Sequence, residues 1–66
     1  MNIQINGARE VVPEGATLPG LLEVLRLSGK RLAIEVNGEI VPRSAFAQTR
    51  LREGDRVEIV QAIGGG

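Results

Sequence analysis

The sequence has 66 residues, its eight basic and eight acidic side chains cancel, and it contains neither cysteine nor histidine. This length predicts a single domain, which buries only about 60% of the surface that its unfolded chain exposes. The missing residue types exclude disulfides, thiolate nucleophiles, iron–sulfur clusters and the usual zinc ligands, and so no metal site is expected. They also remove the side chain most often used for proton transfer near neutral pH.

The balance of charge and the scarcity of aromatic side chains argue against nucleic-acid binding. Phe46 is the only aromatic residue, so bases have no platform on which to stack. No apolar run approaches the length of a membrane span and no signal-peptide pattern opens the chain, which predicts a cytoplasmic protein. A self-sufficient enzyme is the weakest option, because so short a chain has little volume in which to build a pocket.

The first third of the chain predicts a β-hairpin followed by a helix. Residues 1–5 alternate apolar and polar, Asn6-Gly7 is a strong hairpin signal, and the chain returns over Arg9–Val12, where two adjacent valines leave the register open. Pro13-Glu14-Gly15 then breaks the sheet.

The predicted helix begins with Thr17 as N-cap and Pro19 in its first turn. Four leucines at helical spacing form one stripe. The stripe is either a partner-binding surface or part of the core, and the core is favoured because no other predicted element could cover the sheet. The stripe consists of Leu18, Leu21, Leu22 and Leu25. Gly29 is the expected C-cap, with Lys30 and Arg31 near the negative end of the helix dipole.

The second half predicts another hairpin, a helical turn and a final strand. Residues 32–36 alternate, Asn37-Gly38 is the second hairpin signal, and the return over 39–41 stops at Pro42. Residues 43–48 form a short helical turn anchored by Phe46, and residues 53–55 form a turn, in which Glu53 and Asp55 are turn residues rather than catalytic carboxylates. The last strand spans 56–62. Its inward side chains are Val57 and Ile59, and its outward ones are Glu58, Val60 and Ala62.

This order of elements predicts an α+β fold of the β-grasp, ubiquitin-like type. One main helix and a short helical turn cross a mixed sheet, and the last strand pairs in its centre. The expected division is a β-grasp domain over residues 1–62 and a flexible glycine-rich tail over 63–66.

The tail, Gly64-Gly65-Gly66, is either a frayed end or cloning scar or the working part of the protein. Its unusual group is the α-carboxylate of Gly66. A carboxylate is a poor electrophile, so a partner enzyme must first convert it to an acyl-adenylate with ATP, drawing it into a narrow channel. Glycine suits that path because it lacks Cβ and permits close backbone approach. Gly64 and Gly65 supply reach, and affinity is expected to come from the folded domain.

Two stretches and the chain end together resemble the sulfur carrier protein of thiamine biosynthesis, the ThiS family. The resemblance spans essentially the whole chain. The matching residues are Leu32-Ala-Ile-Glu-Val-Asn-Gly-Glu-Ile-Val-Pro-Arg-Ser44, Thr49, Leu51, Glu53-Gly-Asp-Arg-Val-Glu-Ile-Val60 and the terminal Gly65-Gly66.

The resemblance implies a ubiquitin-like protein cosubstrate that binds no cofactor itself. An adenylyltransferase related to ubiquitin-activating enzymes uses ATP and Mg²⁺ to form a glycyl adenylate at Gly66. Sulfur delivered as a persulfide by a cysteine desulfurase or sulfurtransferase replaces AMP, giving a 1-thioglycine thiocarboxylate, which thiazole synthase takes into the thiazole ring.

Other interpretations and the docking surface stay open at this stage. The small subunit of molybdopterin synthase shares the fold and Gly-Gly end, although Pro42-Arg43-Ser44 looks more like the thiamine branch. A ubiquitin-like modifier conjugated to lysines, or a plain interaction module, are the other candidates. Outward side chains beside the tail are expected either to dock on a partner or simply to be exposed: Val60, Ala62 and Ile63. Basic side chains are expected either to meet acidic partner surfaces or to be solvated: Arg43, Arg50 and Arg52.

Overall fold

The computed structural model describes residues 1–61 of the chain. It contains five strands, one α-helix and one 3-10 helix in these residues. In chain order they are β1 (Asn2–Ile5), β2 (Ala8–Val11), α1 (Leu18–Val24), β3 (Leu32–Val36), β4 (Glu39–Val41), the 3-10 helix η1 (Arg43–Gln48) and β5 (Arg56–Gln61).

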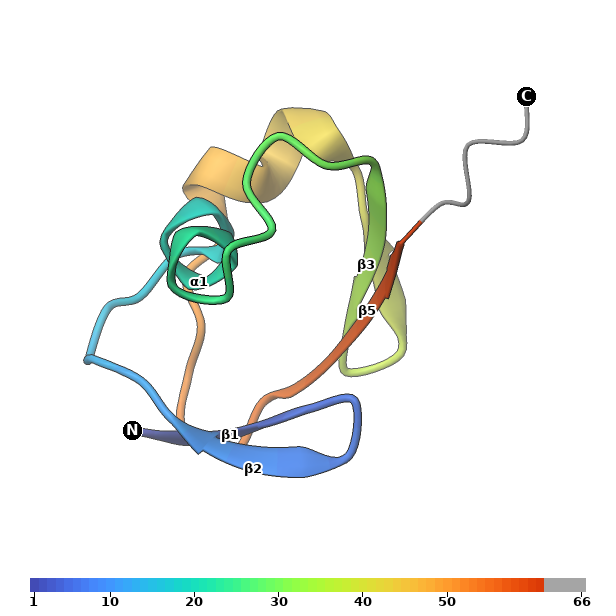
Figure 1. Ribbon diagram of the computed structural model, residues 1–66. Helices are drawn as coiled ribbons and strands as arrows, with labels where there is room; N and C mark the ends of the chain where they lie inside the picture. Colours follow the sequence, from blue (N-terminus) through green and yellow to red (C-terminus); the bar gives the residue numbers. More distant parts are fainter. Residues whose placement is uncertain (62–66) are drawn as a thin grey trace.

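The strands form one mixed sheet in the order β2-β1-β5-β3-β4, with β5 in the centre. β1 and β5 run parallel, and the other three pairs are antiparallel. Figure 1 shows α1 and η1 on the same side of this sheet. The predicted α+β architecture and the central position of the last strand are confirmed.

The space between the sheet and α1 is filled by an entirely apolar core, in which no polar or charged residue of the described part is buried. The leucine stripe of α1 belongs to it, so the interpretation of that stripe as core is confirmed. Phe46 anchors η1, and Val57 and Ile59 of β5 point inward as predicted. The buried side chains are Ile3, Ile5, Val12, Leu18, Leu21, Leu22, Ile34, Phe46, Leu51, Val57 and Ile59.

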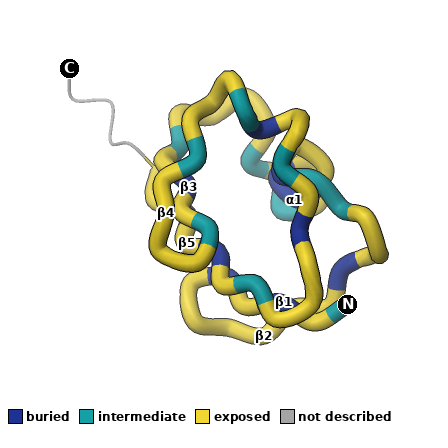
Figure 2. Tube along the Cα trace, turned by 180° about the vertical axis from the view of Figure 1, so that it is seen from behind, coloured by how far each residue is buried: buried dark blue, intermediate teal, exposed yellow. Residues whose placement is uncertain are grey.

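The register of the first hairpin, which the sequence leaves open, follows from its turn. Ile3 lies opposite Glu10, and β2 begins at Ala8 and ends at Val11, so the predicted range of 9–12 is shifted by one residue. Val11 is therefore outward and 76% exposed, whereas Val12 follows the last pair and is buried in the core. Figure 2 shows that β2 is exposed along its whole length.

The helix begins as predicted but ends earlier. Thr17 Oγ1 accepts a hydrogen bond from the amide of Gly20 at 3.3 Å, and Pro19 lies in the first turn. The helix ends at Val24, however, so the prediction of Gly29 as C-cap is wrong, and no basic residue lies in its last turn.

The early end is a Schellman closure around Arg26, which has a φ of 61°. The amide of Arg26 donates to Glu23 O at 3.0 Å and that of Leu27 donates to Leu22 O at 2.7 Å. This pattern normally places glycine in the left-handed position. Here the two hydrogen bonds and the packing of half-buried Leu27 on the core offset the steric cost to Arg26.

The remaining predicted elements agree with the structure over the described residues. The predicted last strand of 56–62 is observed over Arg56–Gln61, and Ala62 lies outside the described residues. Across residues 1–61, no helix is long and apolar enough to cross a membrane.

Candidate functional site

The candidate site is the end of β5, because this strand leads directly to the predicted tail. β5 pairs with β3 through five opposed residues, from Val36↔Val57 to Leu32↔Gln61. On its other side it pairs with β1 only through Gln4↔Arg56 and Ile5↔Val57. The last described residue, Gln61, is thus held in the middle of the sheet, opposite Leu32 of β3.

Asn6 extends the contact between β1 and β5 beyond the backbone pairing. Its φ of 50° turns the main chain into the hairpin, while its side chain stays alongside β5. The amide of Ile59 donates to Asn6 Oδ1 at 2.8 Å, and Asn6 Nδ2 donates to Ile59 O at 3.1 Å. The side-chain amide of Asn6 therefore makes the two hydrogen bonds to β5 that the backbone of a further β1 residue would make.

Asn37 forms a comparable link from the second hairpin to the start of β5. Its Oδ1 accepts from the amide of Arg56 at 2.9 Å, and its Nδ2 donates to Asp55 Oδ1 at 2.9 Å. Both Asn-Gly turns thus bind the tail-bearing strand. The sequence identified these turns, but it carried no signal that their side chains would bind a strand so distant in the chain.

Glu53 and Asp55 are structural turn residues, as predicted. Glu53 Oε1 accepts from the amide of Asn2 at 2.9 Å, and Asp55 Oδ2 accepts from the amide of Arg52 at 2.8 Å. Among residues 1–61, no group of three or more carboxylates, histidines and cysteines is placed to hold a metal ion. The exposed Arg43 donates from Nη2 to Lys30 O at 3.0 Å, which ties η1 to the loop after α1.

The outer face of the sheet carries Val60, which is the one predicted docking residue that lies within residues 1–61. Val60 points outward as predicted, is 63% exposed and lies opposite Ala33 of β3. In the next row, Glu58 lies directly opposite Glu35, and Ile40 of β4 flanks Glu35. The other predicted site residues lie outside the described residues: Ala62, Ile63, Gly64, Gly65 and Gly66.

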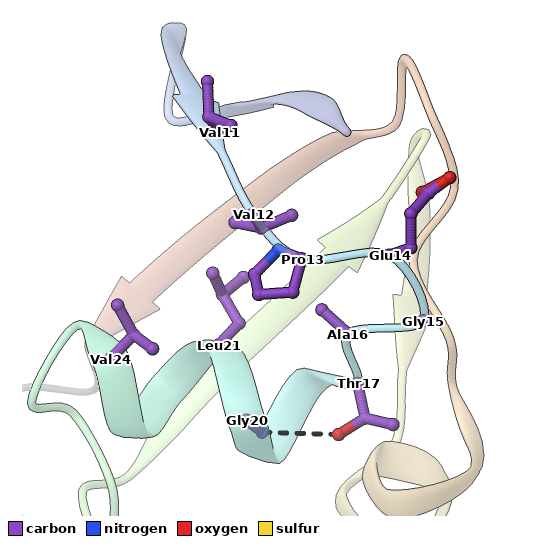
Figure 3. Close-up of a pocket in the computed structure, with 10 residues that line it drawn as sticks. All are labelled: Val11, Val12, Pro13, Glu14, Gly15, Ala16, Thr17, Gly20, Leu21 and Val24. Atoms are coloured by element: carbon purple, nitrogen blue, oxygen red, sulfur yellow. Dashed lines mark hydrogen bonds between the residues drawn. The ribbon is translucent and has the colours of Figure 1, made fainter.

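Two apolar grooves border the core, one along α1 and the other next to the residues that follow its C-terminal end. One, of about 320 Å³, lies between the end of β2 and the helix, where Val12, Pro13, Leu21 and Val24 gather (Figure 3). The other, of about 360 Å³, lies beside Gln61 and is lined by Ile5, Asn6, Leu25, Leu27, Leu32, Ile59 and Gln61. Neither lining contains paired acid and base side chains, so neither resembles a catalytic centre.

The fold and site define a β-grasp domain whose central strand is the last of the strands within residues 1–61. The crystal structure of a thiamine biosynthesis protein, ThiS, from Geobacter metallireducens matches it with a TM-score of 0.86 and 35% sequence identity, over 100% of both chains. The ThiS family model matches residues 2–66. The chain belongs to the ThiS family.

Two curated relatives show the contexts in which similar chains occur. The sulfur carrier protein ThiS of Escherichia coli is 35% identical over 66 residues, with both chains covered completely. A thiazole synthase from Paramagnetospirillum magneticum is 41% identical over 66 residues. That match covers all of this chain but only 20% of the thiazole synthase.

Proposed function

We propose that this protein carries sulfur for thiamine biosynthesis as a thiocarboxylate on Gly66. Membership of the ThiS family and the end-to-end match to the Escherichia coli sulfur carrier are the observations that carry the proposal. In this role the chain is a protein cosubstrate acted on by partner enzymes in the cytoplasm, and not itself an enzyme.

The chemistry begins with the carboxylate of Gly66, which is a poor electrophile until it is activated. A partner adenylyltransferase related to ubiquitin-activating enzymes, using ATP and Mg²⁺, forms the acyl-adenylate and releases pyrophosphate. The outer sulfur of a persulfide, supplied by a cysteine desulfurase or sulfurtransferase, attacks the acyl carbon, and AMP leaves. A thiol then cleaves the sulfur–sulfur bond, which yields the thiocarboxylate and a disulfide.

Thiazole synthase is the proposed receiver of the sulfur. The similarity of this whole chain to a segment of the Paramagnetospirillum magneticum thiazole synthase supports a close functional link between the two kinds of domain. The thiocarboxylate is a soft nucleophile, and attachment to a protein keeps the sulfur from escaping as free sulfide.

Docking through the outer face of the sheet is part of the same proposal. Val60 is exposed on the strand that leads to the tail, and Ala62 and Ile63 follow it in sequence. In this proposal the folded surface supplies the binding affinity. Gly64 and Gly65 only make the Gly66 carboxylate reachable and take no part in the chemistry.

Intact-mass measurement of the protein purified from cells that contain its partners tests the proposal. We expect a fraction whose mass corresponds to one oxygen replaced by sulfur, located at Gly66. Deletion of Gly66 should abolish this species and thiazole formation without changing the urea midpoint of unfolding. Thiazole formation by the deleted chain would refute the proposal. Covalent adducts on lysines would identify a protein modifier instead, and molybdopterin auxotrophy of a deletion strain would identify the molybdopterin branch.

A further inference from the structure

The β1 side of β5 is an open edge at Gln61. The backbone carbonyls of Asp55 and Val57 accept hydrogen bonds from the amides of Gln4 and Asn6, at 2.9 Å each, and Ile59 binds the Asn6 side chain. Arg56, by contrast, bonds Asn37 at the end of β3. Because hydrogen-bonding direction alternates along a strand, Gln61 points its N–H and C=O toward the side of β1. Among residues 1–61, no strand lies opposite it there, since β1 ends at Ile5 and Asn6 turns away.

The groove beside Gln61 borders the same open edge. Half-buried leucines form much of its wall, contributed by the loop after α1 and the start of β3: Leu25, Leu27 and Leu32. Among residues 1–61, its lining contains no charged side chain, and its only polar side chains are those of Asn6 and Gln61. An unpaired strand edge next to an apolar groove accepts an extended segment that offers backbone hydrogen bonds and an aliphatic side chain together.

The length of the tail limits how far the partner can lie from the end of β5. Gly66 lies five residues beyond Gln61, since the chain has 66 residues. Five fully extended residues span at most about 17 Å. A partner that holds the Gly66 carboxylate in its nucleotide site must therefore approach within that distance of Gln61, and its surface comes close to the groove.

We propose that the enzyme that activates Gly66 docks an extended, uncharged segment against Gln61 and places an aliphatic side chain in the groove lined by Leu25, Leu27 and Leu32. The segment continues the sheet where Asn6 ends the contribution of β1. This inference rests on the proposed function and names a docking surface on the opposite face of the sheet from Val60.

Gln61→Pro tests the backbone contact. Proline removes the N–H that faces the open edge, but it removes no bond to β3, so the domain should keep its urea midpoint. The assay is pyrophosphate release by a carrier-activating adenylyltransferase with ATP, using the full chain. Loss of the edge contact should raise the KM for the carrier about tenfold and leave kcat within about twofold. Gln61→Ala, which loses the same side chain but retains the N–H, is the matched comparison, and the KM of Gln61→Pro should exceed that of Gln61→Ala.

Leu27→Gln tests the groove, because a polar side chain in its wall should raise the KM for the carrier. Val24→Gln is the control. Val24 is 75% exposed and lines the other groove, so its substitution should leave the KM unchanged. A KM for Gln61→Pro equal to that of Gln61→Ala, or a rise in KM for Val24→Gln alone, would overturn the inference. A fall in kcat without a rise in KM would also overturn it, because that result indicates a misdirected tail. Failure of the unsubstituted chain to release pyrophosphate would instead refute the proposed function on which the inference rests.

Discussion

Asn6 and Asn37 occupy the first position of the two Asn-Gly turns, and both are left-handed, with φ of 50° and 53°. A type I′ turn explains this conformation, which asparagine tolerates better than most residues. The turn alone does not explain why both side-chain amides bind the backbone of β5. Each asparagine therefore sets a hairpin and also fixes the strand that precedes the tail.

Asn6→Gly separates these two roles, because glycine keeps the turn and loses both hydrogen bonds to Ile59. We expect the free energy of unfolding to fall by about 1–2 kcal/mol, measured by urea denaturation. Asn37→Gly should cost less, since its side-chain bonds are solvent-exposed whereas those of Asn6 are partly buried. Equal stability of Asn6→Gly and the unsubstituted protein would show that the side-chain pair contributes nothing.

Arg26 has a conformation that suits glycine, and its replacement is a second test at this scale. Arg26→Gly should raise the free energy of unfolding by about 0.5–1 kcal/mol, because relief of the left-handed strain exceeds the added entropy of the unfolded chain. Gly29→Ala is the opposite control: its φ of 81° predicts destabilisation. Thermal unfolding of both variants measures the two changes in stability. An Arg26→Gly variant less stable than the unsubstituted protein would contradict the assignment of strain to Arg26.

At the scale of elements, the strands and turns could be predicted from the sequence more readily than the end of α1 or the side-chain hydrogen bonds of Asn6 and Asn37 to β5. Two-residue periodicity and the Asn-Gly pairs located β1 and β3, and the Thr17 cap located the start of α1. The prediction of Gly29 as the C-cap of α1 was wrong because the helix end at Arg26 depends on how Leu27 packs on the core, which is a tertiary effect. The candidate site at Gly66 was predicted from the terminal glycines and the resemblance, and it stays a prediction. The groove beside Gln61 could not be predicted, because four segments distant in the sequence must meet to form it.

The pair formed by Glu35 and Glu58 places like charges opposite each other on β3 and β5. Glu58→Lys should therefore stabilise the domain by about 0.2–1 kcal/mol, and less so at high salt. Glu39→Lys is the control, because it changes net charge equally but lies opposite Val36. Urea denaturation at two salt concentrations distinguishes the local pair from a general charge effect, which would stabilise both variants alike.

For the whole molecule, stability depends on one small apolar core. Ile34 has 0% of its surface exposed in the middle of β3. Ile34→Ala should cost about 2–5 kcal/mol, which is a large part of the stability expected for a domain of this size. Ile40→Ala, at a position that is 74% exposed, should stay within about 0.5 kcal/mol of the unsubstituted protein. Circular dichroism during heating measures both, and similar melting temperatures for the two variants would contradict this account of the core.

Of the five strands described, the central one, β5, is also the last to be synthesised. Without β5, the two hairpins β1–β2 and β3–β4 share no paired strand, because β5 is the element that joins them. A nascent chain on the ribosome therefore lacks the strand that completes the sheet until residues 56–61 emerge. A chain that ends before β5 lacks the strand that joins the two halves of the sheet, and we expect it not to fold. Completion of the fold thus waits for the strand that directly precedes the glycine-rich end of the sequence.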